Sequence, residues 1–135
     1  MNPQANAADV YKRATLENAP PIKIIRMLYQ GAMRFLDEAA RLDPEAERHA
    51  FQERLHRAEA IVVELRISLE RDHAPDICTE LERLYMFIEE KIREAVDERS
   101  IEPIAAARQV LETLAAAWAE VEVETAEAGG VGEAA

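Results

Sequence analysis

The chain has 135 residues, a length that suits one compact domain with a single core. Its formal charge of −11, from 27 acidic and 16 basic residues, argues against nucleic acid and anionic membrane surfaces as partners, because both favour an excess of Lys and Arg. The composition is rich in alanine but has only four glycines and 5% aromatic residues, which favours an all-α protein.

The single cysteine, Cys78, excludes a disulfide within the chain, and residues 1–13 have no apolar segment of the kind that a secretory signal needs. We therefore expect a protein of the reducing cytosol. No run approaches the roughly 18–20 apolar residues that span a bilayer, so membrane insertion is not expected.

Prolines mark where the helices are expected to begin, because proline is tolerated in the first turn of a helix but not in its interior. Asn18, Asp43 and Ser100 each precede one of these prolines and are suitable capping residues. The expected helices cover residues 20–42, 44–71, 75–99 and 101–126. Their short connections predict an antiparallel up-down-up-down four-helix bundle.

Apolar residues recur in alternating steps of three and four, which places them on one face of each helix. The first two inward faces are formed by Ile22, Ile25, Tyr29, Ala32, Leu36 and Ala39, and by Phe51, Leu55, Ala58, Val62, Leu65 and Leu69. The last two are formed by Ile77, Leu81, Leu84, Tyr85, Ile88, Ile92 and Ala95, and by Ile104, Ala107, Leu111, Leu114, Trp118 and Val121.

The two ends of the chain lie outside this pattern. Residues 1–19 have only Val10, Tyr11 and Leu16 as sizeable apolar groups, and we expect a mobile N-terminal arm. Residues 127–135 combine Gly, Glu and Ala and are expected to form a disordered tail. The bundle domain is therefore predicted over residues 20–126.

The first expected helix carries more apolar surface than one bundle face requires. Its polar residues form one narrow stripe, while the apolar face is widened by Ile24, Leu28, Phe35, Met27 and Met33. A shorter strip on the second helix consists of Ala60, Val63 and Ile67. Contiguous exposed apolar surface often marks a partner site, and flexible methionines suit varied partners. The alternative is that neighbouring helices cover both strips.

Residues suited to metal binding or catalysis are poorly placed. Two Glu-x-x-His pairs, Glu53–His56 and Glu70–His73, resemble part of a di-iron site, but such a site draws ligands from all four helices of a bundle and both pairs fall on the second. Cys78 has the acidic Glu82 one turn away, which disfavours a thiolate. We expect no enzyme activity, no metal and no cofactor.

The run PIKIIRMLYQGAMRFL at residues 21–36 resembles the opening helix of the flagellar secretion chaperone FliS family, in which a proline precedes a Leu-Tyr-x-Gly-Ala run. The similarity continues in the family's order through residues 57–69, the Leu-Tyr-Met-Phe-Ile run at 84–88, and residues 110–114 with Trp118. It covers about residues 10–121. The chain departs from the family at its Asn-Ala-Pro-Pro lead and at Gln30.

The resemblance implies an export chaperone that binds the disordered C-terminal segment of flagellin in the cytosol, prevents its premature polymerisation and helps deliver it to the export gate. It also implies an N-terminal arm that covers part of the binding surface, where this chain has Tyr11. The expected partner contacts are Tyr11, Ile24, Leu28, Met33, Val63, Ile67 and Tyr85. A scaffold or homodimerising bundle and a metal-dependent bundle enzyme are the alternatives, and the chain is expected to be a monomer or weak dimer.

Overall fold

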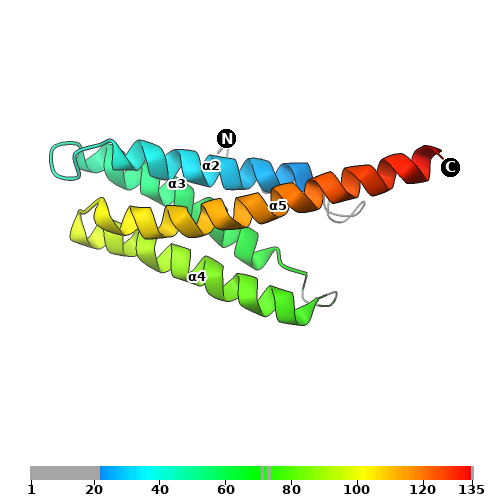
Figure 1. The fold of residues 1–135 in the computed structure, drawn as a ribbon. Helices are drawn as coiled ribbons and strands as arrows, with labels where there is room; N and C mark the ends of the chain where they lie inside the picture. The colour runs from blue at the N-terminus through cyan, green and yellow to red at the C-terminus, as the bar shows by residue number, and fades with distance from the viewer. Residues whose placement is uncertain (1–21, 71, 73, 135) are drawn as a thin grey trace.

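A computed structural model describes residues 22–70, 72 and 74–134 of the chain, with side chains described as far as residue 121 and at residue 123. Four helices make up this part of the protein (Figure 1): α2 (Ile22–Ala40), α3 (Arg48–Ile67), α4 (Pro75–Glu98) and α5 (Glu102–Ala134). The described residues contain no strand, so the prediction of an all-α protein is confirmed.

The helices pack as an antiparallel four-helix bundle (Figure 1). Helix α2 packs against α3 and α5, and α4 packs against the same two helices, whereas within the described residues no backbone contact joins α2 to α4 or α3 to α5. Each helix therefore occupies one corner of a square and has two neighbours and one diagonal partner. This is the predicted up-down-up-down arrangement.

The core consists mainly of the predicted inward faces. Its largest fully buried side chains include Tyr29, Tyr85, Phe51, Leu36 and Leu55. Two predicted core residues are exposed instead: Ile77 is 63% exposed and Val121 is 38% exposed. Ile77 lies in the first turn of α4, and Val121 lies in α5 beyond Leu111, the last residue of that helix in the buried core.

Asp43 and Ser100 accept backbone hydrogen bonds near the expected helix starts, but Asp43 does not cap α3, whose N-cap is Glu47 without a side-chain cap bond. The Asp43 carboxylate accepts hydrogen bonds from the backbone N–H of Glu45 at 2.9 Å and of Ala46 at 3.1 Å. These bonds form a turn ahead of the helix, so α3 begins at Arg48 rather than at residue 44. The Ser100 hydroxyl accepts from the N–H of Glu102 at 3.1 Å, at the start of α5. Asn18 and the expected arm, residues 1–19, lie outside the described residues.

The ends of two helices differ from the prediction. Helix α3 ends at Ile67 rather than at residue 71, and the N–H of Ser68 closes its last turn on the Glu64 carbonyl at 3.1 Å. Helix α5 continues to Ala134, so the end expected at residue 126 was wrong, and residues 127–134 are helical where a disordered tail was expected. Ala and Glu favour helix there and no proline interrupts it, although Gly129, Gly130 and Gly132 disfavour it.

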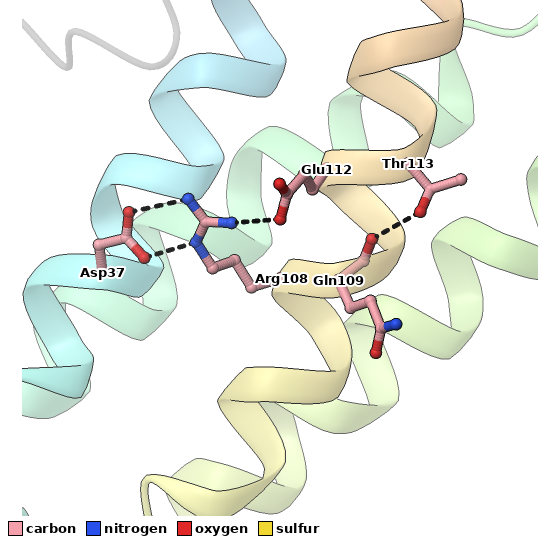
Figure 2. Close-up of polar contacts among 5 residues, drawn as sticks. All are labelled: Asp37, Arg108, Gln109, Glu112 and Thr113. Atoms are coloured by element: carbon pink, nitrogen blue, oxygen red, sulfur yellow. Dashed lines mark hydrogen bonds and ion pairs between the residues drawn. The ribbon is translucent and has the colours of Figure 1, made fainter.

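Charged side chains join neighbouring helices on the surface. In Figure 2, the Arg108 guanidinium of α5 donates to both carboxylate oxygens of Asp37 on α2, at 2.7 and 3.4 Å, and to Glu112 at 2.8 Å. The hydrogen bond with Asp37 raises the pKa of Arg108 above its usual value. On the other side of α2, Arg54 of α3 lies 3.0 Å from Glu38. Within the described residues, no helix is both long enough and apolar enough to cross a bilayer.

Candidate functional site

The two ends of the bundle are built differently. One end carries both the α2–α3 and the α4–α5 connections, and we call it the closed end (Figure 1). The opposite end carries only the α3–α4 connection, together with the start of α2 and the part of α5 that runs past it, and we call it the open end. At the open end α5 thus runs on past the start of α2.

A tight turn forms one half of the closed end. Arg99 adopts a left-handed conformation, with φ of 51° and ψ of 54°, directly after α4. Its N–H bonds to the Val96 carbonyl at 3.3 Å, and the N–H of Ser100 bonds to the Ala95 carbonyl at 3.1 Å. These bonds satisfy carbonyl groups that the end of a helix would otherwise leave unpaired.

The open end contains a cavity of about 180 Å³, which we call the end pocket. All four helices and the α3–α4 connection contribute to its walls. Its larger apolar lining residues are Ile25, Leu65, Leu69, Ile77, Leu81 and Trp118. An apolar cavity of about 150 Å³ is large enough to bind benzene. The end pocket therefore has the size and the chemistry to receive one large apolar side chain.

Hydrogen bonds link three aromatic side chains at this pocket. Tyr85 and Trp118 line the pocket, and Tyr29 lies behind them in the core. The hydroxyls of Tyr29 and Tyr85 are hydrogen-bonded to each other, and the Trp118 indole N–H donates to the Tyr29 hydroxyl at 3.1 Å. We call these residues the tyrosine–tryptophan cluster. Buried hydroxyl and indole groups need such partners, because leaving them unpaired away from water costs free energy.

The mouth of the pocket has an exposed apolar residue, Ile77, which lines the pocket and is 63% exposed. Ile67, the last residue of α3, is 57% exposed but is not one of the lining residues. Cys78 follows Ile77 and is buried, and its thiol donates to the Glu70 carbonyl at 3.2 Å. That contact gives Cys78 a structural role in closing the α3–α4 connection.

An ion pair links α3 and α4 close to the pocket. Arg66 follows the lining residue Leu65, and its Nε and Nη2 atoms donate to the two carboxylate oxygens of Glu89 at 2.6 and 3.2 Å. Glu89 is buried, and the hydrogen bond with it raises the pKa of Arg66 above its usual value. This two-point contact fixes the rotation of α3 relative to α4.

One of the predicted partner contacts lies at the end pocket, because Tyr85 lines it with a buried ring. Ile67 is exposed on α3 and is not one of the lining residues. Ile24 and Met33 are partly buried against the core, and Val63 is half-buried on α3. Tyr11 lies outside the described residues. The predicted contacts therefore do not form one patch.

The wide apolar flank expected on the first helix is mostly covered. Leu28 is only 5% exposed and belongs to the core, so its expected position on an open flank was wrong. The guanidinium groups of Arg34 and Arg57 lie 5.3 and 5.7 Å from the Phe35 ring centroid and shield it. Met27, at 61% exposure, is the one large apolar residue of α2 that remains well exposed in the described part. Neighbouring helices wrap α2 more widely than an idealised bundle face suggests.

The sequence prediction assigned several pocket residues to the core only. Leu69, Leu81 and Trp118 pack against the core as expected, whereas Ile77 is exposed at the pocket mouth, and the pattern does not show where the bundle ends. Two signals could have located them. Ile77 closely follows Pro75, where a helix begins, and Trp118 brings a polar N–H into an apolar seam.

A second hollow, larger at about 620 Å³ but more open to solvent, lies along the outer side of α4. It is lined by Met86 and Phe87, which are 51% and 37% exposed, and by charged residues that include Arg83 and Glu90. The Lys91 ammonium lies 5.7 Å from the Phe87 ring centroid.

Within the part of the chain that the structure describes, no three His, Cys, Asp or Glu side chains are grouped closely enough to hold a metal ion.

Comparison with known proteins gives this fold a family. No curated protein matches the chain. The family model described as flagellar protein FliS matches residues 4–125, which include all of α2, α3 and α4 and most of α5. Because that match spans nearly the whole sequence, this helical bundle belongs to the FliS family of flagellar chaperones.

Proposed function

We propose that this protein binds the disordered C-terminal segment of flagellin in the cytosol, keeps it from polymerising prematurely and helps deliver it to the flagellar export gate. Family membership supports the general role in flagellar assembly. The observation that carries the finer proposal is the end pocket, an apolar cavity of about 180 Å³ with the exposed Ile77 at its mouth.

In this proposal the client folds on the chaperone. A segment that forms a helix on binding presents apolar residues at spacings of three and four, so one side chain can enter the pocket while its neighbours contact the mouth. Burying one large apolar side chain contributes about 1.5–3 kcal/mol. Ordering the segment offsets part of this gain, so the complex can still release its client at the export gate.

The proposed contacts follow from exposure. Ile67 and Ile77 are the outer contacts, and Tyr85 and Trp118 form the inner walls. Ile24, Met33 and Val63 are retained as proposed side contacts because each keeps some exposed surface. Tyr11 is retained as the proposed cover of the site when no client is bound. Leu28 is not retained, because it is buried in the core.

The test is a calorimetric titration of the full-length protein with the C-terminal segment of flagellin. Ile77→Asp places a charge at the pocket mouth and should weaken binding at least about tenfold. Ile101→Asp is the matched control, since Ile101 is 48% exposed but lies in the α4–α5 connection at the closed end. Absence of saturable binding by the wild type, or wild-type affinity in Ile77→Asp, would contradict the proposal.

The alternative is a homodimerising bundle, and the exposed Met86 and Phe87 on α4 favour it. Light scattering over a concentration series separates the two functions. A tight dimer whose mass is unchanged by the flagellin segment would support the alternative. A monomer that gains the mass of one segment would support the chaperone.

A further inference from the structure

We propose that Tyr29 is a positioning residue for the end pocket, and that its hydroxyl holds the Trp118 indole in place as the α5 wall of that pocket. The inference rests on the proposed function, because the wall matters only if the pocket receives a client. Tyr29 is fully buried and does not line the pocket, so it acts through the two residues that do.

The indole of Trp118 needs an acceptor to stay in its observed position. An indole N–H can only donate, and the Tyr29 hydroxyl accepts its hydrogen bond at 3.1 Å. Trp118 is half-buried, so water is available on its outer side. Without the Tyr29 oxygen, the indole gains more by turning its N–H toward water than by keeping an unpaired N–H in the wall.

The same hydroxyl also fixes the opposite wall. Tyr29 on α2 is hydrogen-bonded to the hydroxyl of Tyr85 on α4, and the two ring centroids are 6.3 Å apart. Helices α2 and α4 are diagonal partners without backbone contact, so this pair links them directly across the core. One oxygen atom of Tyr29 therefore sets the distance between Tyr85 and Trp118, and with it the width of the pocket.

The first experiment follows the fluorescence of the full-length protein without any client, since Trp118 is the only tryptophan. Tyr29→Phe keeps the ring and removes the acceptor, so the emission should shift to the red and acrylamide should quench it more strongly. Tyr85→Phe is the matched control: it removes the other hydroxyl of the pair but leaves Trp118 its acceptor, so both signals should stay near wild type. Unchanged emission in Tyr29→Phe, or an equal change in Tyr85→Phe, would overturn the proposal.

The second experiment measures affinity for the C-terminal flagellin segment. Loss of one fixed hydrogen bond should weaken binding about 3- to 10-fold in Tyr29→Phe. Because Tyr29 acts partly through Trp118, the same substitution should have a smaller effect in a Trp118→Phe background, whereas independent structural effects would multiply in full. Multiplying effects would overturn the positioning role, as would wild-type affinity in Trp118→Phe alone.

The two experiments separate the inference from the proposed function. If the wild type does not bind the flagellin segment, the proposed function fails, and the fluorescence of Tyr29→Phe still decides whether Tyr29 holds the indole. Thermal unfolding of each variant checks that it is folded. Should Tyr29→Phe not fold, the affinity of Trp118→Phe, which leaves both tyrosines intact, decides whether the indole wall contributes to binding.

Discussion

Replacing Arg66 by methionine should destabilise the protein more than replacing its partner Glu89 by glutamine. The side chain of Glu89 is 6% exposed and that of Arg66 is 30% exposed, so the two partners of this ion pair are not equivalent. Without Arg66, a carboxylate stays buried with no cation beside it. Without the charge on Glu89, the guanidinium can turn toward water.

The size of the effect follows from this difference in exposure. Removing one partner of a fully buried ion pair costs about 3–5 kcal/mol, and because water reaches Arg66 we expect about 2–3 kcal/mol for Arg66→Met. Glu89→Gln keeps an acceptor for Arg66 and should cost about 1 kcal/mol. For a chain of this length 1 kcal/mol corresponds to about 4 °C, so Arg66→Met should lower Tm by roughly 8–12 °C.

Thermal and urea unfolding, followed by circular dichroism at neutral pH, measure these differences. Arg93→Met is the matched control, because Arg93 also joins α4 to α3, through Glu59 at 3.7 Å, but its side chain is 63% exposed. Its loss should cost less than about 0.5 kcal/mol. The double variant Arg66→Met, Glu89→Leu should recover most of the stability lost in Arg66→Met, because no charge is then left buried.

Two results would refute this reasoning. The first is an Arg66→Met variant no less stable than Arg93→Met, which would mean that the carboxylate of Glu89 reaches water on its own. The second is a double variant as unstable as Arg66→Met, which would mean that the cost arises from lost packing of the arginine stem. Either result would show that an unpaired buried charge does not cause the loss of stability in Arg66→Met.

Substitutions at three further positions should change the free energy of unfolding, which urea unfolding measures. Two of them should raise it and one should lower it. Arg99→Gly should raise stability by about 0.5–1 kcal/mol, because glycine adopts the left-handed conformation without strain. Arg99→Ala should give no such gain, and an equal gain in that variant would contradict the reasoning. Gly31→Ala should also gain about 0.5–1 kcal/mol, because a Cβ there meets Ile61 Cδ1 at an ordinary 3.4 Å, and a loss would show that α3 cannot accept the methyl group. The pKa of Asp43 lies below its usual 3.8, because the N–H groups of Ala46 and Glu45 donate hydrogen bonds to its carboxylate. The ionised Asp43 therefore stabilises the fold above about pH 4, and this contribution is lost as the pH falls through the lowered pKa. The deficit of Asp43→Ala should therefore be equal at about pH 5 and pH 7 and should shrink below about pH 3; a deficit that stays constant down to about pH 2 would contradict this.

The fold could be predicted because its determinants are local. Steps of three and four place Tyr29, Leu36, Phe51 and Leu55 on the faces that the structure buries, and short connections leave few ways to arrange four helices. The ends of the helices were harder to predict, because each end depends on the conformation of a single turn. The carboxylate of Asp43 forms a turn before α3, so the helix begins later than the proline suggests.

The candidate site could be predicted only in part, because it depends on how the helices sit against one another. A helical pattern shows which way Leu28 faces but not how far α3 and α5 extend around α2, so its burial was missed. The pocket needs the starts of α2 and α4, the end of α3 and the middle of α5 at one level, which no single segment specifies. The contact between Trp118 and Tyr29 joins residues 89 positions apart and depends on the relative rotation of α5 and α2.

The unequal ends of the bundle have a consequence for its motions. At the closed end, two short connections and the ion pairs of Asp37 with Arg108, Glu38 with Arg54 and Glu45 with Arg99 restrain the helices. The open end has one connection, so the first turns of α2 and α4 should unfold locally more often, and their amide hydrogens should exchange with solvent faster than those near Leu36 or Ala95. A partner bound at the open end suppresses these openings, so the amides that exchange fastest in the free protein should gain the most protection in the complex.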